Sequence, residues 1–222
     1  MTSPRSPSDA LRARVLAEAR SLPSPTRAQH RARALALGAG GVLATLALFF
    51  AMGGPKSGTR PAELIAFHAV FTLSFALVLT RLAGGAPGKM LGRPRAVLLG
   101  ATAIAAPALA LGALAAAALW PEVAAADDAS TRTHVACSVL TIAQGALPLA
   151  ALLVPRRGTD PIHPAVSGAA LGMAAGAWAA TMAYLRCPHG AASHCVIAHV
   201  GPALLLAAAG AALGALLLRI PR

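Results

Sequence analysis

All three cysteines and four of the seven histidines fall in two short stretches of the 222-residue chain. The first stretch opens an apolar run and holds His134 and Cys137, which lie one helical turn apart. The second is a polar loop with the start of the next apolar run, and it holds Cys187, His189, His194, Cys195 and His199. Thiolate and imidazole groups bind metal ions, and two thiols can instead form a disulfide in an oxidising compartment. These side chains are the strongest chemical feature of the sequence.

Three interpretations of this cluster stay open. A disulfide, most simply between Cys137 and Cys187, would join the two stretches. A metal site would draw its ligands from His134, Cys137, Cys187, His189, His194 and His199. In the third interpretation the histidines lie at the membrane interface and the cysteines are small buried residues. Because the spacing matches no standard zinc motif, we expect no bound metal and no cofactor.

Motifs of catalysis are missing from the sequence. It contains no nucleophile elbow, no phosphate-binding loop and no dinucleotide-binding glycine fingerprint. Only seven Asp and Glu residues are present, too few for the core of a carboxylate-driven transporter, and none lies in the middle of an apolar run. We expect that the protein is not an enzyme.

The elements that position the cluster are those of a membrane protein. Hydrophobic residues make up 57% of the chain and charged residues only 12%, about half the charged share of a soluble domain. A membrane-spanning helix needs about 20 mostly apolar residues. Six runs have this character: 35–54, 62–80, 96–120, 135–154, 165–185 and 196–218. We predict an all-α, polytopic bundle of six transmembrane helices over residues 35–222, preceded by a cytoplasmic arm of residues 1–34.

Positive charge gives the bundle an orientation. All but four of the 19 Lys and Arg residues lie in the arm, in the loops after the second and fourth runs, or in the C-terminal tail; the four are Lys56, Arg60, Arg132 and Arg186. Cytoplasmic loops carry the excess of Lys and Arg in membrane proteins. Both termini are therefore expected in the cytoplasm, and the Cys and His cluster at the outer face. Since the net charge of +12 follows this topology pattern, we expect no direct binding to nucleic acid.

Glycines recur every four residues in the last two runs. The fifth has Gly168, Gly172 and Gly176, and the sixth has Gly210 and Gly214. This spacing places glycines on one face and lets two helix backbones approach closely. We expect these two helices to pack tightly against each other.

The arm contains one amphipathic helix and the start of a second. Leu11, Val15, Ala19 and Leu22 share one face of the first helix. Thr26 and Gln29 fit a capping box at the start of the second, which can run directly into the first span. The apolar stripe has two possible partners, the inner surface of the bilayer or a groove in another protein.

Short motifs at both ends of the chain resemble a known family. The arm segments LRARVL at 11–16 and PSPTR at 23–27, the outer motif RCPH at 186–189 and a cysteine near the start of the fourth span are similar to the negative regulators of sigma-F. These are bacterial inner-membrane anti-sigma factors with six helices. The likeness covers essentially the whole chain.

The resemblance implies a function for the arm and for the cysteines. The arm, with Leu11, Val15, Leu16, Ala19 and Leu22, would hold an extracytoplasmic-function sigma factor and keep it from RNA polymerase. An outer signal, such as a redox change, would release it in a stress response. Cys137 and Cys187 would correspond to the sensing cysteines of the family, whereas Cys195 is an additional cysteine that complicates which pair forms.

A second class of function uses the same cluster differently. The outer histidines and cysteines could belong to a small membrane transporter, or to a membrane protein that handles a metal or haem. Stoichiometric metal or a haem spectrum in the purified protein would favour this alternative. Co-purification with a sigma factor would favour the anti-sigma function.

Overall fold

The computed structural model describes residues 7–21, 26–55, 60–84, 94–125, 129–157 and 162–219. This part of the chain is all α and contains no strand, which confirms the all-α part of the predicted fold class. The helices in order are α1 (Pro7–Ser21), α2 (Arg27–Ala51), α3 (Ala62–Gly84), α4 (Arg95–Leu119), α5 (Pro121–Ala125), α6 (Thr131–Leu153), the 3-10 turn η1 (Val154–Arg156), α7 (Pro164–Arg186), α8 (Ala192–Cys195), the π-helix η2 (Val196–Val200) and α9 (Gly201–Leu217).

Five helical segments are long and apolar enough to cross a membrane. They cover 62–83, 95–119, 131–156, 164–186 and 192–217, and they correspond to the second to sixth predicted spans. The first predicted span differs, because the apolar part of α2 is the shorter segment Ala36–Ala51. The first turns of α2 carry arginines and a histidine instead. Length and composition thus support five spans, and α2 falls short of the same criterion.

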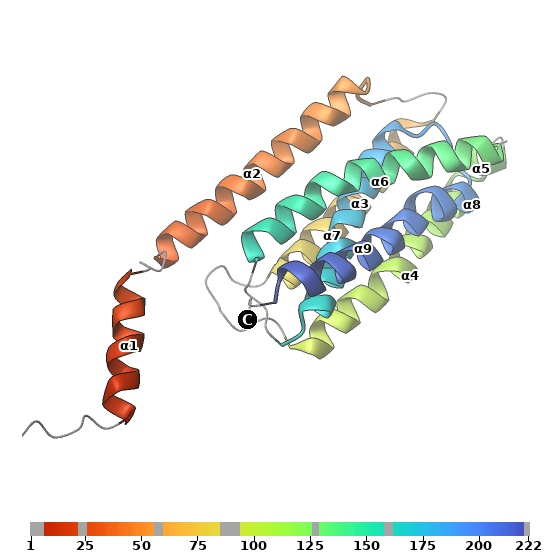
Figure 1. Cartoon of the computed structure of the whole chain (residues 1–222). Coiled ribbons are helices and arrows are strands. Elements are labelled where there is room, and N and C mark those ends of the chain that lie inside the picture. The colour runs from red at the N-terminus through yellow and green to blue at the C-terminus, as the bar shows by residue number, and fades with distance from the viewer. Residues whose placement is uncertain are drawn as a thin grey trace, which may run out of the picture.

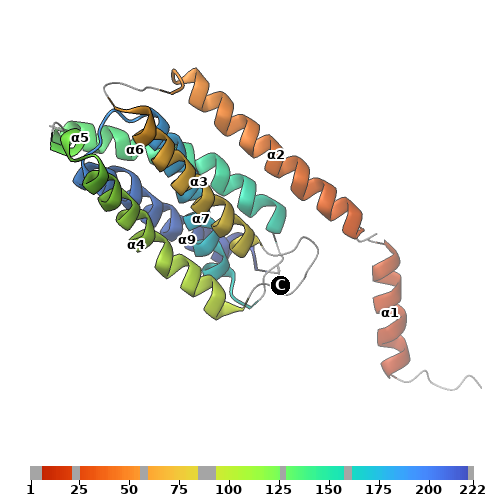
Figure 2. The same cartoon turned by 180° about the vertical axis from the view of Figure 1, so that it is seen from behind.

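Helix α7 lies at the centre of the bundle. Most of its residues between Ser167 and Tyr184 are buried, and its main neighbours are α9, α3 and α6. Figures 1 and 2 show α3, α4, α6 and α9 around it, with α2 alongside α6 and α1 apart from the bundle. The core is built largely of Ala and Leu side chains from these five helices.

The two ends of the bundle differ in what they hold. One end holds the start of α2 and the last turn of α9; the other holds α5, α8 and the loop that follows α7 (Figure 1). We call the second end the outer end, following the orientation predicted from Lys and Arg. The Cys and His cluster therefore belongs to one end of the bundle.

The glycines of α7 and α9 bring the two backbones into contact, as predicted. A Cβ on Gly168 would overlap the carbonyl oxygen of Gly210, and one on Gly172 would overlap that of Leu206. A Cβ on Gly176 would lie 2.6 Å from the Cα of Ala203. No side chain fits between these helices, so α7 and α9 form one closely packed unit.

The second helix of the arm begins as predicted and continues into the bundle without a break. The backbone N–H of Gln29 donates to Thr26 Oγ1, and the N–H of Thr26 donates to Gln29 Oε1, which completes the capping box. Helix α2 then runs through the expected boundary between residues 34 and 35 as a single helix. Movement of the apolar part of α2 would therefore carry residues 27–34 of the arm with it.

Candidate functional site

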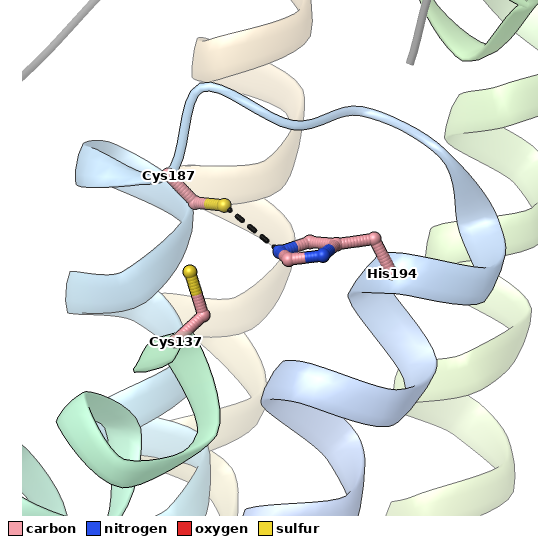
Figure 3. Close-up of side chains that lie close together, drawn as sticks. All are labelled: Cys137, Cys187 and His194. Atoms are coloured by element: carbon pink, nitrogen blue, oxygen red, sulfur yellow. Dashed lines mark hydrogen bonds between the residues drawn. The ribbon is translucent and has the colours of Figure 1, made fainter. Parts of the chain in front are cut away.

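Three potential metal ligands meet at the outer end. Cys137 lies two turns into α6, Cys187 follows the last residue of α7, and His194 lies on α8. The two sulfurs and an imidazole nitrogen all lie within 4.8 Å of one another. In Figure 3 the Cys137 sulfur points from α6 toward the Cys187 sulfur, and the His194 ring approaches both from α8. Three separate elements thus direct their donor atoms to one point.

The chain reaches this point because α7 ends there and the chain turns back. The N–H of Cys187 still donates to the carbonyl of Ala183, so the residue is fixed by the helix although its backbone is extended. Residues 187–191 then form a loop that leads into α8. His194 returns to Cys187 from the other side of this loop, and its Nε2 lies 3.2 Å from the Cys187 sulfur.

The environment favours the protonated form of Cys187. A hydrogen bond with the Cys137 sulfur and burial both raise the pKa of the Cys187 thiol. The Cys187 sulfur also contacts His194 Nε2, and which of the two atoms donates depends on the tautomer of the ring. No disulfide joins the three cysteines in this structure.

Other histidines surround His194. The rings of His134 and His189 each lie 4.7 Å from its ring centroid, and the ring of His199 lies 5.4 Å away. His134 Nδ1 is 2.9 Å from the carbonyl oxygen of Ser130. Three of the predicted histidines therefore surround the ring of a fourth, His194, which is completely buried.

A buried polar layer continues from His199 toward the centre of the bundle. The Tyr184 ring lies between His199 and His68, at centroid distances of 5.0 and 4.3 Å. Thr141 Oγ1 lies 3.2 Å from His199 Nδ1 and 3.1 Å from the Ala198 carbonyl, which ties α6 to the π-helix. π-Helical turns of this kind occur frequently at functional sites.

Arg60 closes the layer beside α7. Its Nη1 donates to the carbonyl oxygen of Tyr184 at 2.9 Å, and the side chain is 5% exposed. Burial lowers the pKa of Arg60, while its positive charge interacts with Cys187 and Cys195. A basic group thus lies close to the sulfur atoms, where negative charge would develop on metal binding or thiol ionisation.

The sequence identified most, but not all, of these residues. Cys195 is buried in a separate apolar cluster with Ala113, Ala180 and Tyr184, and it does not join the three potential ligands. His68, Tyr184 and Arg60 are additional buried residues that the sequence-based candidates omitted. One sequence feature could have identified His68: it is an ionisable residue at the outer end of an apolar run.

The partner-binding candidates lie in α1. Leu11, Val15 and Leu16 are 64%, 56% and 48% exposed. Ala19 lies in the same helix, though its side chain falls outside the described part, and Leu22 lies outside the described residues. An exposed apolar stripe on a helix apart from the bundle is available for an interaction.

The sequence matches a known family over almost its whole length. The family described as negative regulator of sigma F covers residues 17–220. The chain belongs to this family. Among curated proteins and solved structures, none gives a significant match.

Family membership gives the protein its general role. It is a negative regulator of a sigma factor, that is, an anti-sigma factor. The resemblance that the arm and the RCPH motif suggested is therefore confirmed. The matched region contains the whole outer site and the five long apolar helices.

Proposed function

We propose that this negative regulator of sigma F is embedded in the bacterial inner membrane. In this proposal α2 is the first of six spans, and both termini lie in the cytoplasm. The five long apolar helices support membrane embedding. The arginines in the first turns of α2 lie where a span emerges on the cytoplasmic side, which is the position of an interfacial anchor.

The arm binds the sigma factor. Its partner is an extracytoplasmic-function sigma factor, which residues 1–34 would keep from RNA polymerase. The observation that carries this step is the exposed stripe of Leu11 and Val15 on a helix that the bundle does not cover. A lone helix of about 15 residues is marginal in water, so it needs a groove in which to bury this stripe.

A signal at the outer end releases the sigma factor. Cys137 and Cys187 belong to α6 and to the end of α7, so any link between their sulfurs fixes how these two helices pack at that end. An oxidant that forms a disulfide, or an ion that binds both sulfurs, would have this effect. Since α2 packs against α6, a change in the position of α6 can reach the arm.

Co-purification tests the proposal directly. The full-length protein, extracted in mild detergent, should retain a sigma factor. Leu11→Asp or Val15→Asp should lower this retention at least ten-fold, because a carboxylate buried in an apolar groove costs several kcal/mol. Ala13→Asp places the same charge on the opposite face of α1 and should bind as the parent does.

The outcome also separates the anti-sigma function from its alternatives. If neither Asp variant loses the sigma factor, the stripe serves only to attach the arm to the bilayer. A parent protein that captures no sigma factor but carries haem or transports a solute would contradict the proposal.

A further inference from the structure

We propose that Cys137, Cys187 and His194 form a binding site for one thiophilic metal ion, Zn²⁺ or Cu(I). This inference rests on the proposed function only in taking the ion as the outer signal. The three ligands themselves are inferred from the geometry of the side chains. It goes beyond the thiol pair by adding His194, from a third element, as a ligand.

The distances suit an ion. Typical Zn–S and Zn–N bonds of about 2.3 and 2.0 Å place neighbouring ligand atoms about 3.5–4 Å apart in a tetrahedral or trigonal site. The three donor atoms already lie within 4.8 Å of one another, with 3.2 Å between the Cys187 sulfur and His194 Nε2. Small side-chain movements therefore complete the coordination, with no need to rearrange the helices.

The burial of His194 needs an explanation that packing alone does not give. The side chain is 0% exposed, and its Nδ1 has no hydrogen-bond partner among the described residues. Burying an imidazole without satisfying its polar atoms costs free energy. Coordination at Nε2 would leave Nδ1 unpaired, but the metal–nitrogen bond would offset the cost of burying the ring.

A metal site uses all three donors, whereas a disulfide uses two. If Cys137 and Cys187 joined in a disulfide, His194 Nε2 would lose the thiol that faces it. An ion instead binds both sulfurs and the ring nitrogen. The third donor is the observation that favours an ion over a disulfide as the natural occupant.

The ligand types select the class of ion. Thiolate and imidazole suit Zn²⁺ and Cu(I), while Mg²⁺ and Ca²⁺ require oxygen ligands. No carboxylate joins this group among the described residues. Binding displaces the two thiol protons, which makes a Zn²⁺ site neutral and a Cu(I) site singly negative. The nearby positive charge of Arg60 can balance the latter.

Such an ion would bridge three elements at the outer end. It would connect α6, the C-terminal end of α7 and α8. Because α7 and α9 form one closely packed unit, the bridge fixes α6 relative to that unit. Metal binding would therefore restrict the position of α6, the helix that packs against α2.

Metal titration of the full-length protein tests the site. The protein is purified in detergent under reducing conditions and titrated with Co²⁺, whose thiolate charge-transfer absorption reports sulfur ligation. Zn²⁺ competition and a Cu(I) chelator assay then compare the two ions. We expect one equivalent of Co²⁺, displaced by Zn²⁺ or Cu(I), with two-thiolate absorption.

Variants identify the ligands. Cys137→Ser, Cys187→Ser and His194→Ala should each weaken binding at least 100-fold, whereas Cys195→Ser removes a buried neighbouring thiol and should leave affinity unchanged. His194→Cys should restore binding with three-thiolate absorption, which separates lost ligation from misfolding.

Several results of these experiments would contradict the proposed metal site. Reduced parent protein that binds none of the three ions, or a Cys195→Ser variant that loses binding as strongly as Cys137→Ser, would overturn the proposal. A Cys137–Cys187 disulfide in the purified protein, with no ion bound after reduction, would instead assign the site to redox sensing. Sigma factor retention is measured on the same preparations, so failure of the metal site is distinguishable from failure of the anti-sigma function.

Discussion

At the scale of single residues, the outer end is a polar site enclosed by apolar helices. His194 and His199 are 0% and 1% exposed, and both lie on the short segment formed by α8 and η2. Polar groups at membrane depth are costly and are retained when they have a function. His194 contacts the Cys187 sulfur, and the His199 ring packs against His194, so the two buried rings belong to one polar site.

His134 is expected to be the fourth ligand of a tetrahedral ion. Its Nδ1 faces the Ser130 carbonyl, an arrangement typical of metal-bound histidines, so Nε2 is the nitrogen left for an ion. His134→Gln should weaken Co²⁺ binding about 10-fold and change the coordination geometry seen in the visible spectrum.

His189→Gln is the matched control for that substitution. The His189 ring lies at the same 4.7 Å from His194, but it belongs to the loop after α7, whereas His134 lies on α6 one helical turn before Cys137. The control should bind within about 3-fold of the parent. If His134→Gln keeps both the affinity and the spectrum of the parent, the site has three protein ligands only.

The sequence could predict only in part which residues form this site. It named Cys137, Cys187 and His194 among its candidates, but their spacing along the chain does not show which sulfurs meet. Cys195 follows His194 directly, yet the two side chains leave the helix about 100° apart. Only the packed helices show that His194 faces the thiol pair while Cys195 joins the apolar cluster.

At the scale of elements, regular patterns made prediction more successful. The glycine spacing predicted the contact between α7 and α9, and runs of apolar residues gave the positions of five spans to within a few residues. The capping box at Thr26 and Gln29 also predicted a helix that can run directly into the first apolar run, as α2 does. Composition could not reveal η2, whose Ala198 carbonyl and His199 ring contact Thr141 of α6.

The contact between α7 and α9 is expected to be highly sensitive to added volume. In Gly172→Ala the new methyl group would overlap the Leu206 carbonyl and lie 2.8 Å from the Cα of Ala207. Backbone atoms cannot move aside, so the substitution should destabilise the bundle by about 2 kcal/mol or more. Thermal unfolding of the detergent-solubilised protein measures the effect.

Gly100→Ala in α4 provides the same chemical change without the contact. Nothing lies within 4 Å of the added Cβ. Its stability should be unchanged or raised by up to about 1 kcal/mol, since Ala favours a helix more than Gly does. Equal stabilities of the two variants would show that α7 and α9 are not packed as described.

At the scale of the whole molecule, the charge asymmetry predicts a topology that reporters can check. Fusions after Arg93 or Arg222 should report a cytoplasmic location, and a fusion near Asp127 should report an external one. The start of α2 and the end of α9 already lie at the same end of the bundle, as an even number of spans requires. An external C-terminus would contradict the six-span arrangement.

The route from the outer site to the arm runs along α6. Cys137 lies near the outer end of this helix, and Ala151 lies 14 residues further on, about 21 Å away at the helical rise. There Ala151 packs against Gly41 of α2, so closely that a Cβ on Gly41 would overlap its methyl group. Helix α2 in turn leads back to the arm, so in the proposed mechanism this contact would convert a shift of α6 into a shift of the arm.

Gly41→Leu should therefore uncouple the two ends of the molecule. In reconstituted vesicles, Zn²⁺ should weaken sigma factor binding to the parent about 10-fold, within the usual range of coupling between two sites. In Gly41→Leu the added side chain pushes α2 from α6, so the effect of Zn²⁺ should fall below about 2-fold while Co²⁺ binding at the outer end is retained. Gly40→Leu adds the same side chain at a position with nothing within 4 Å, and it should respond to Zn²⁺ as the parent does. If Gly41→Leu also responds fully, the signal reaches the arm by a route other than the contact between α2 and α6.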